Sequence, residues 1–186
     1  MTVFIDLGAY RGATIGSFRR SRAFVEGQTA IYAWECNPHL ADVDYGEGVT
    51  VVRAAAWVAD GELPFYISRV RPEKVQGSSV CKNKRTGNLD VENPVVVQTI
   101  DFARWLGQFA AVDHVVVKMN IEGAEYDVLE HLCDTQAIRL IDVLHVQWHW
   151  NKCGIAPERH RALVSRLEAI DTLVVHPGYG VLRSGR

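Results

Sequence analysis

The chain begins with Thr2-Val-Phe-Ile-Asp-Leu-Gly-Ala-Tyr-Arg-Gly12, an apolar run that ends in a carboxylate and then turns at two glycines. Apolar and β-branched residues of this kind favour a buried strand, and glycines permit a tight loop before helix-compatible residues begin. In an open parallel sheet, ligands bind beyond the carboxyl ends of the strands. The stretch therefore predicts a strand, a ligand-facing loop and a helix start, with the loop as a candidate cofactor site.

The residues of this loop discriminate between cofactors. A dinucleotide site needs Gly-x-Gly-x-x-Gly, because backbone N–H groups must approach a pyrophosphate closely, whereas Tyr10 stands here at the second glycine position. Asp6 would repel a phosphate and attract a cation, such as the ammonium group or the sulfonium of S-adenosylmethionine (SAM). The pattern therefore favours SAM over NAD or ATP. A glycine-bounded turn with a solvated aspartate is the alternative interpretation at this point.

The composition indicates one ordinary globular domain. The 186 residues, 48% hydrophobic and 23% charged, suffice for a sizeable core. We expect a single domain over residues 1–186 in the cytoplasm, without a membrane span, because no apolar run approaches the roughly 20 residues that a span requires. The net charge of −2 gives no reason to expect nucleic acid as a partner. Four scattered cysteines, at positions 36, 81, 133 and 153, are interpreted as free thiols.

A second short apolar strand is expected at Ala30–Glu35, and it again ends in a carboxylate. Two vicinal hydroxyls of a ribose can both donate to one carboxylate, and the end of the second strand is where such an acid is needed. Glu35 is therefore predicted to hold the ribose, with a solvent-facing acid as the alternative. Val49–Arg53 predicts a third strand, and the alanines after it would let a flat ring approach beside Trp57, which could equally be core filling.

A long segment with few element signals follows the strand expected at Gly61–Ser68 and precedes another at Val95–Thr99. Six basic residues face one acid between Arg69 and Arg85, which gives this segment a charge of +5. Long loops in compact domains are usually functional or mobile. We interpret residues 69–94 as a flap over the substrate. The simpler interpretation of its positive charge is a solvated loop, and the more specific one is that it binds an anionic substrate or partner.

The second candidate site lies at the end of a strand expected at His114–Asn120. Lys118, Asn120, Glu122 and Glu125 crowd the mouth of this valine-rich strand, where polar groups are costly to desolvate without a partner or a function. A fifth strand, Ile141–Trp148, is followed by His149, a potential base that could also be a satisfied structural histidine.

The remaining segments are predicted as scaffold. Asp101 is interpreted as the N-cap of a helix with an apolar stripe. A helix begins at Pro157, and Leu173–Val175 and Tyr179–Leu182 are expected to form a terminal pair of strands.

With these residues in view, the chain resembles the FkbM family of SAM-dependent methyltransferases. The match rests on an ordered set of motifs. These are the loop Phe4–Gly12, the second-strand motif Ala33-Trp-Glu-Cys-Asn-Pro38, the segment Thr99-Ile-Asp101, and Val117-Lys-Met-Asn-Ile-Glu-Gly-Ala-Glu125.

The resemblance implies an α/β, Rossmann-like class I methyltransferase fold. This fold is a central seven-stranded, mostly parallel sheet with an antiparallel last strand and helices on both faces. It also implies SAM as cofactor, S-adenosylhomocysteine as product and O-methylation as the usual activity. The cofactor-binding residues expected on this basis are Asp6, Gly8, Ala9, Tyr10, Arg11, Gly12, Thr14, Glu35, Cys36, Asn37, Ala55, Ala56, Trp57, Ser79 and Asn120.

Two positions depart from the family pattern. Asn120 replaces an aspartate, and Gln147 replaces a glutamate two residues before the retained His149. Both changes remove potential metal ligands, so metal dependence is not expected but stays open. The chain also starts directly at its first strand, without the preceding helices common in such enzymes, so it could be an excised domain of a larger protein.

The expected chemistry is methyl transfer to a hydroxyl of a sugar, glycan or glycosylated small molecule. A sugar hydroxyl is weakly acidic, so a general base matters. His149 is the first candidate for this base and Glu122 the second, Lys118 would position the acceptor or stabilise developing negative charge, and Ser78 would contact the acceptor. An RNA 2′-O-methyltransferase and a non-catalytic SAM-binding module are the alternatives, and the oligomeric state is left open.

Overall fold

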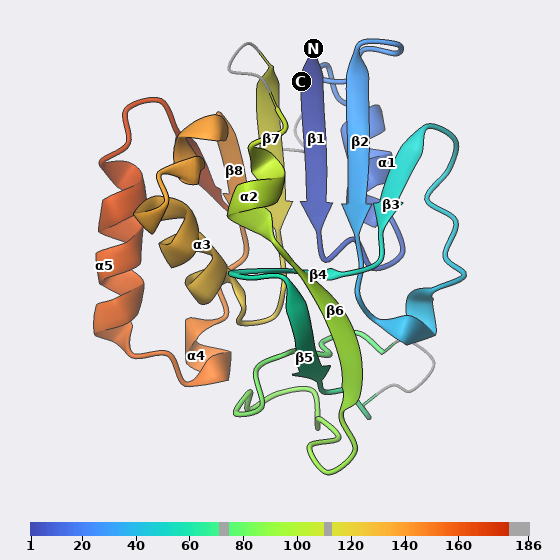
Figure 1. The fold of residues 1–186 in the computed structure, drawn as a ribbon, viewed down its shortest axis with the longest axis vertical. Helices are drawn as coiled ribbons and strands as arrows, with labels where there is room; N and C mark the ends of the chain where they lie inside the picture. The colour runs from blue at the N-terminus through green and yellow to red at the C-terminus, as the bar shows by residue number, and fades with distance from the viewer. Residues whose placement is uncertain (71–74, 110–112, 179–186) are drawn as a thin grey trace.

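The computed structural model describes residues 1–70, 75–109 and 113–178, and these residues form an α/β fold (Figure 1). The described part of the main sheet has six strands, and every neighbouring pair is parallel. In spatial order they are β3 (Val49–Val52), β2 (Thr29–Trp34), β1 (Thr2–Leu7), β7 (His114–Met119), β8 (Val143–Val146) and β9 (Val174–Pro177). The chain proceeds outward from β1 in one direction and from β7 in the other, so the switch point, where ligands bind in such sheets, lies between them.

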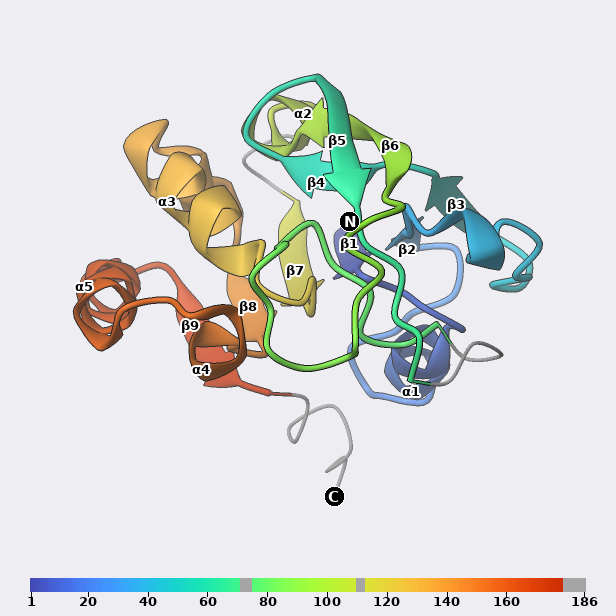
Figure 2. The same cartoon turned by 90° about the horizontal axis from the view of Figure 1, so that it is seen from below.

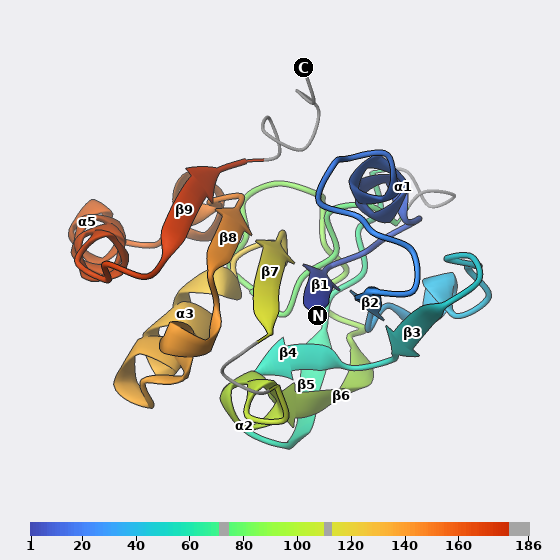
Figure 3. The same ribbon diagram turned by 90° about the horizontal axis from the view of Figure 1, so that it is seen from above.

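Helices cover both faces of the main sheet, as predicted (Figure 3). One face carries α1 (Ala13–Arg19), and the other carries α2 (Phe102–Leu106), α3 (Glu125–Asp134) and α5 (Pro157–Glu168). Shorter helical turns are η1 (Pro38–Leu40), η2 (Ala137–Leu140) and α4 (Trp150–Cys153). The predicted N-cap of α2 is confirmed, because the Asp101 side chain accepts a hydrogen bond from the Arg104 amide.

The two faces of β1 bury different residues, since successive strand side chains point to opposite sides. Val3, Ile5 and Leu7 join the core under α2 and α3. Phe4 lies on the other face and stacks on Phe18 of α1, with ring centroids 4.0 Å apart. Asp6 follows the parity of Phe4, so its side chain points toward the α1 face.

A second, three-stranded sheet lies beyond the carboxyl ends of the main sheet (Figure 1). Its order is β4 (Ala55–Trp57), β6 (Val95–Asp101) and β5 (Gly61–Phe65), with β4 parallel and β5 antiparallel to β6. The strands expected at Gly61–Ser68 and Val95–Thr99 therefore correspond to β5, which ends at Phe65, and to β6, and they lie in a separate sheet. The strand β4 was not predicted, because a run of three alanines has no β signature.

The seventh, antiparallel strand stays a prediction. Leu173–Val175 overlaps β9, which pairs directly and in parallel with β8. Residues Tyr179–Leu182, expected to supply the last strand, lie outside the described residues.

The described part of the flap, residues 69–70 and 75–94, lies beyond the carboxyl ends of the main-sheet strands and passes below β1 and β7 (Figure 2). Antiparallel bridges join Tyr66 to Ser79 and Ser68 to Leu89, so the flap folds back along the segment that follows β5. Residues 71–74 of the flap are outside the described part. Among the residues that are described, no helix has the length and apolar character needed to cross a membrane.

Candidate active site

The loop after β1 is held tightly between its neighbours. Gly8 has a φ of +75°, and a Cβ atom there would lie 2.2 Å from the carbonyl oxygen of Asn120. The amides of Gly8 and Ala9 both donate to the carbonyl of Trp34, at 3.0 and 2.9 Å. Glycine at position 8 is therefore required twice, for its backbone conformation and for the close approach of the segment after β7.

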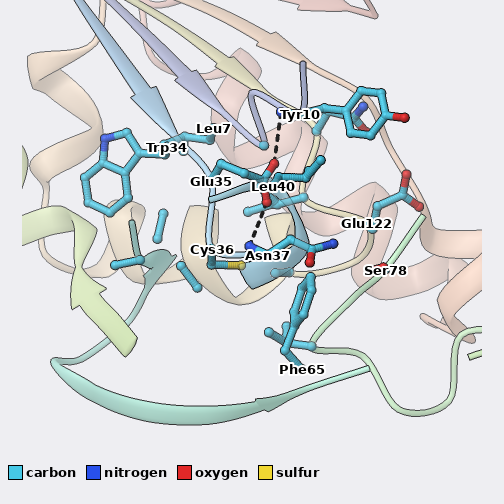
Figure 4. A pocket seen from close by; sticks show the side chains of 18 of the residues that line it. Leu7, Tyr10, Trp34, Glu35, Cys36, Asn37, Leu40, Phe65, Ser78 and Glu122 are labelled. Atoms are coloured by element: carbon cyan, nitrogen blue, oxygen red, sulfur yellow. Dashed lines mark hydrogen bonds between the residues drawn. The ribbon is translucent and has the colours of Figure 1, made fainter. Parts of the chain in front are cut away.

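Glu35 holds the same loop from the side of β2 (Figure 4). Its Oε2 accepts a hydrogen bond from the amide of Tyr10 and its Oε1 accepts one from the amide of Asn37, each at 2.9 Å. Burial raises the pKa of Glu35, and these two N–H groups oppose that rise by stabilising the charged form. Tyr10 accommodates the arrangement with a φ of +51°, and its carbonyl accepts a hydrogen bond of 2.7 Å from the Tyr45 hydroxyl.

A pocket opens at the switch point between this loop, β4, the flap and the segment after β7 (Figure 4). Eleven of the predicted site residues line it, namely Gly8, Tyr10, Glu35, Cys36, Asn37, Ala55, Ala56, Trp57, Ser78, Asn120 and Glu122. Apolar residues that the sequence did not single out complete the walls, among them Leu7, Leu40, Phe65 and Ile121. The pocket thus brings together most of the predicted cofactor side with Ser78 and Glu122 of the predicted acceptor side.

Asp6 and Lys118 do not line this pocket. They are register partners on β1 and β7, and their side chains form a buried ion pair with Oδ1 and Nζ 2.6 Å apart. Burial raises the pKa of Asp6, and the Lys118 ammonium opposes this rise. Lys118 also donates to the carbonyl of Gly8 at 2.8 Å. The pair therefore supports the glycine loop from the α1 side of the sheet.

Five other predicted residues also lie outside the pocket lining. Ala9 is buried against α1, Gly12 is the N-cap of α1, and Thr14 lies in its first turn. The Arg11 guanidinium lies 5.7 Å from the centre of the Tyr10 ring. Ser79 donates through its hydroxyl to the carbonyl of Glu122 at 2.7 Å, so it joins the flap to the segment after β7.

His149 is fully buried behind Glu122 and does not line the pocket. Its Nε2 lies 3.5 Å from the Glu122 carboxylate, and its Nδ1 lies 3.0 Å from Oε1 of the buried Glu125. The Nδ1–Glu125 contact, in which we assign the proton to Nδ1, leaves Nε2 as a proton acceptor. Glu122, Glu125 and His149 thus form a row that ends at the pocket wall.

Lys84 of the flap also reaches this row. Its Nζ lies 3.0 Å from Oε2 of Glu122, and its side chain is only 2% exposed. Arg69 pairs with Asp90 inside the flap, so two of its basic residues form contacts within the protein. Sequence analysis did not identify Lys84 as a site residue, because a lysine next to an arginine is usually a solvated charge. It did not identify Tyr45 because no motif in its irregular segment indicates a function.

Among the described residues, no group of three or more histidine, cysteine or acidic side chains is arranged to hold a metal ion. The expectation about metal dependence stays a prediction.

A parallel sheet with a glycine loop and a strand-end glutamate at its switch point is the arrangement of a Rossmann-like nucleotide-binding protein. The fold and the site define only this broad class, and a comparison with protein families identifies the family. The profile of the Methyltransferase FkbM domain matches residues 6–171, so the chain belongs to the FkbM methyltransferase family, as its motifs predicted. Members of this family are generally SAM-dependent. No curated protein and no solved structure was found to match the chain.

Proposed function

We propose that this methyltransferase uses SAM to methylate a hydroxyl group of a sugar, a glycan or a glycosylated small molecule. The observation that carries the proposal is the position of Glu122. It lines the pocket that Glu35 also lines, and its carboxylate lies 3.5 Å from Nε2 of the buried His149. The same pocket thus contains Glu35, which we propose binds the ribose, and Glu122, which together with His149 could accept a proton.

The pocket residues suit SAM. Each Glu35 oxygen accepts one backbone N–H and keeps acceptor capacity for a ribose hydroxyl. Leu7, Ala56 and Trp57 provide apolar surface for an adenine ring. SAM would supply a methyl group on a sulfonium and leave as S-adenosylhomocysteine. The Asp6 carboxylate, predicted to attract the cofactor's ammonium, is already paired with Lys118, so this proposal gives it a supporting role.

Glu122 is the better placed of the two candidate bases, because it reaches the pocket and His149 does not. We propose that the Glu122 carboxylate accepts the hydrogen bond of the acceptor hydroxyl and that the proton passes to it as the O–CH₃ bond forms. His149 then acts as a positioning residue, held by Glu125 and able to take up this proton at Nε2. The Lys84 ammonium pairs with the same carboxylate, with Nζ 3.0 Å from Oε2 of Glu122.

A second hollow supports a hydroxyl-rich acceptor. It is lined by Arg85, Trp150, Asn151, Gly154, Ile155, Ala156 and Pro157. Two of these residues, Arg85 and Trp150, are the chain neighbours of Lys84 and His149. An aromatic ring, an amide and a guanidinium are groups that would pack on a sugar ring and bind its hydroxyls or a phosphate.

A methyl-transfer screen tests the proposal. Radiolabelled SAM is incubated with monosaccharides, nucleotide sugars, glycans and RNA, and SAM affinity is measured separately by calorimetry. We expect transfer to a sugar hydroxyl. In Glu122→Gln the rate of transfer should fall by about two orders of magnitude or more while the SAM affinity stays nearly unchanged, because the general base is lost. Glu168→Gln, an exposed control on α5, should transfer at the wild-type rate.

Two outcomes would contradict the proposal. Binding of SAM without transfer to any acceptor would identify a non-catalytic module. Transfer to RNA alone would favour the alternative substrate.

A further inference from the structure

Two cysteines that are 72 residues apart in the chain meet behind the pocket wall. Cys81 lies in the flap and Cys153 ends α4. Around the point where a side chain of Gly123 would begin, the Cβ of Cys153 lies at 3.2 Å and the Cβ of Cys81 at 3.3 Å. The missing side chain of Gly123 leaves the space in which the two cysteines approach.

The contacts of the two thiols differ. Cys153 is buried and donates through Sγ to the carbonyl of Glu122 at 3.4 Å. Cys81 is partly exposed, and its Sγ lies 3.9 Å from the Cys153 carbonyl. The neighbouring Cys153 thiol lowers the pKa of Cys81 to about 7, whereas the proximity of Cys81 and burial raise the pKa of Cys153. Cys81 has the properties of an attacking thiol and Cys153 those of a resolving one.

The position of Cys81 links this pair to the pocket. The flap residues Val75–Ser78 and Val80 line the pocket immediately before Cys81. After it, the amide of Arg85 donates to the carbonyl of Lys152 at 2.6 Å, so the flap lies directly on α4 here. A covalent bond between Cys81 and Cys153 would fix the pocket-lining part of the flap to the body of the protein.

We propose that Cys81 and Cys153 form a reversible disulfide that holds the flap closed over the pocket, with a low-molecular-weight disulfide such as oxidised glutathione as oxidant. The Cys81 thiolate attacks one glutathione sulfur, which breaks the glutathione S–S bond and releases one glutathione thiolate. Cys153 then gives its proton to water and attacks the Cys81 sulfur, which releases the second thiolate. The protein loses two electrons, and the oxidant becomes two thiols.

Two other cysteines serve as internal controls. Cys36 lines the pocket and Cys133 lies in α3, and burial raises the pKa of both thiols. Neither shares the contact that the Cys81 and Cys153 thiols make, so both should react more slowly with a small disulfide.

The test treats the full chain with oxidised glutathione and follows intact mass and peptide maps. We expect the wild type and Cys133→Ser to lose two hydrogens and yield a peptide that links Cys81 to Cys153. Cys153→Ser should instead stop at a glutathione adduct on Cys81, and Cys81→Ser should show no adduct on Cys153. A wild type that retains a stable adduct on Cys81, or that never modifies Cys81, overturns the proposal.

Hydrogen exchange separates the closure of the flap from the chemistry. In the oxidised wild type, amides of residues 75–90 should exchange at least tenfold more slowly than in the reduced protein, and a reductant should reverse this. Unchanged exchange would refute the closing role. Neither measurement needs SAM, so failure of this inference and failure of the proposed function are distinguishable.

Discussion

Asp6 and Glu35 stand at the carboxyl ends of neighbouring parallel strands, and only Glu35 reaches the pocket. Asp6 is fully buried beneath the loop, paired with Lys118. Glu35 lies one residue past the end of β2 and binds the loop from the pocket side. The two acids hold the same glycine loop from opposite sides. Asp6 pairs with Lys118, which donates to the carbonyl of Gly8, and Glu35 accepts a hydrogen bond from the amide of Tyr10.

The difference follows from which face of the sheet each side chain joins. Asp6 is within β1 and must follow the alternation of its strand, whereas Glu35 lies just past the last residue of β2, where the chain enters the loop before η1. A carboxylate at a strand end is therefore a ligand-binding group only if its parity or the turn directs it to the open edge. The contrast predicts that changes around Asp6 act on stability and that changes around Glu35 act on binding.

The largest effect is expected for Lys118→Met. The change leaves the Asp6 carboxylate buried without its partner, which should reduce the free energy of unfolding by about 3–5 kcal/mol. Denaturant titration measures it, with the exposed Lys82→Met as control. The double variant Asp6→Asn with Lys118→Met should recover part of the loss. A change in Lys118→Met no larger than in the control would contradict a structural ion pair.

A smaller loss is expected for Gly8→Ala. A side chain there meets the Asn120 carbonyl, so the loop must move, and we expect a loss of more than about 2 kcal/mol together with loss of SAM binding. Gly48→Ala is the matched control, because it has a similar φ of +71° and nothing within 4 Å of its added Cβ. It should cost only the strain of its backbone, about 1–2 kcal/mol. Equal losses in the two variants would show that the close contact is unimportant.

The smallest effect on stability is expected for Tyr45→Phe. The variant loses the hydrogen bond from its hydroxyl to the Tyr10 carbonyl and keeps the ring, so about 0.5–1.5 kcal/mol should be lost. Tyr66→Phe, a buried tyrosine outside this loop, serves as the comparison. Thermal unfolding of both variants checks the assignment, which is wrong if Tyr45→Phe is as stable as the wild type.

The sequence predicted the parts of the fold that local patterns encode. Strand and helix positions followed from apolar runs and caps, and strand ends located the pocket, as Glu35 and Glu122 show. The face that Asp6 joins could not be predicted, because β1 is buried on both sides and its residues carry no alternation. The contacts of Lys84 and Tyr45 were missed for a related reason, since each is made by an irregular segment whose path only the whole fold determines.

The pH dependence of SAM binding sharpens the role of Glu35. Burial raises the pKa of this carboxyl above its ordinary value, so its protonated fraction grows at a higher pH than for a free glutamate. As the pH is lowered, the folded state therefore binds a proton at Glu35 at a higher pH than the unfolded state does. As pH falls through this range, SAM affinity should weaken while the contribution of Glu35 to stability rises. Calorimetry and denaturation across pH measure both, and slopes of the same sign would contradict the assignment.

The central claim is that the pocket binds SAM through Glu35. Calorimetric titration of SAM into the wild type and into Glu35→Gln, which keeps the size of the side chain, tests it most directly. Hydrogen bonds to a charged group contribute about 1.5–3 kcal/mol, so the dissociation constant should rise at least tenfold while the free energy of unfolding changes far less than in Lys118→Met. An unchanged dissociation constant in Glu35→Gln, or no SAM binding by the wild type, would contradict the claim.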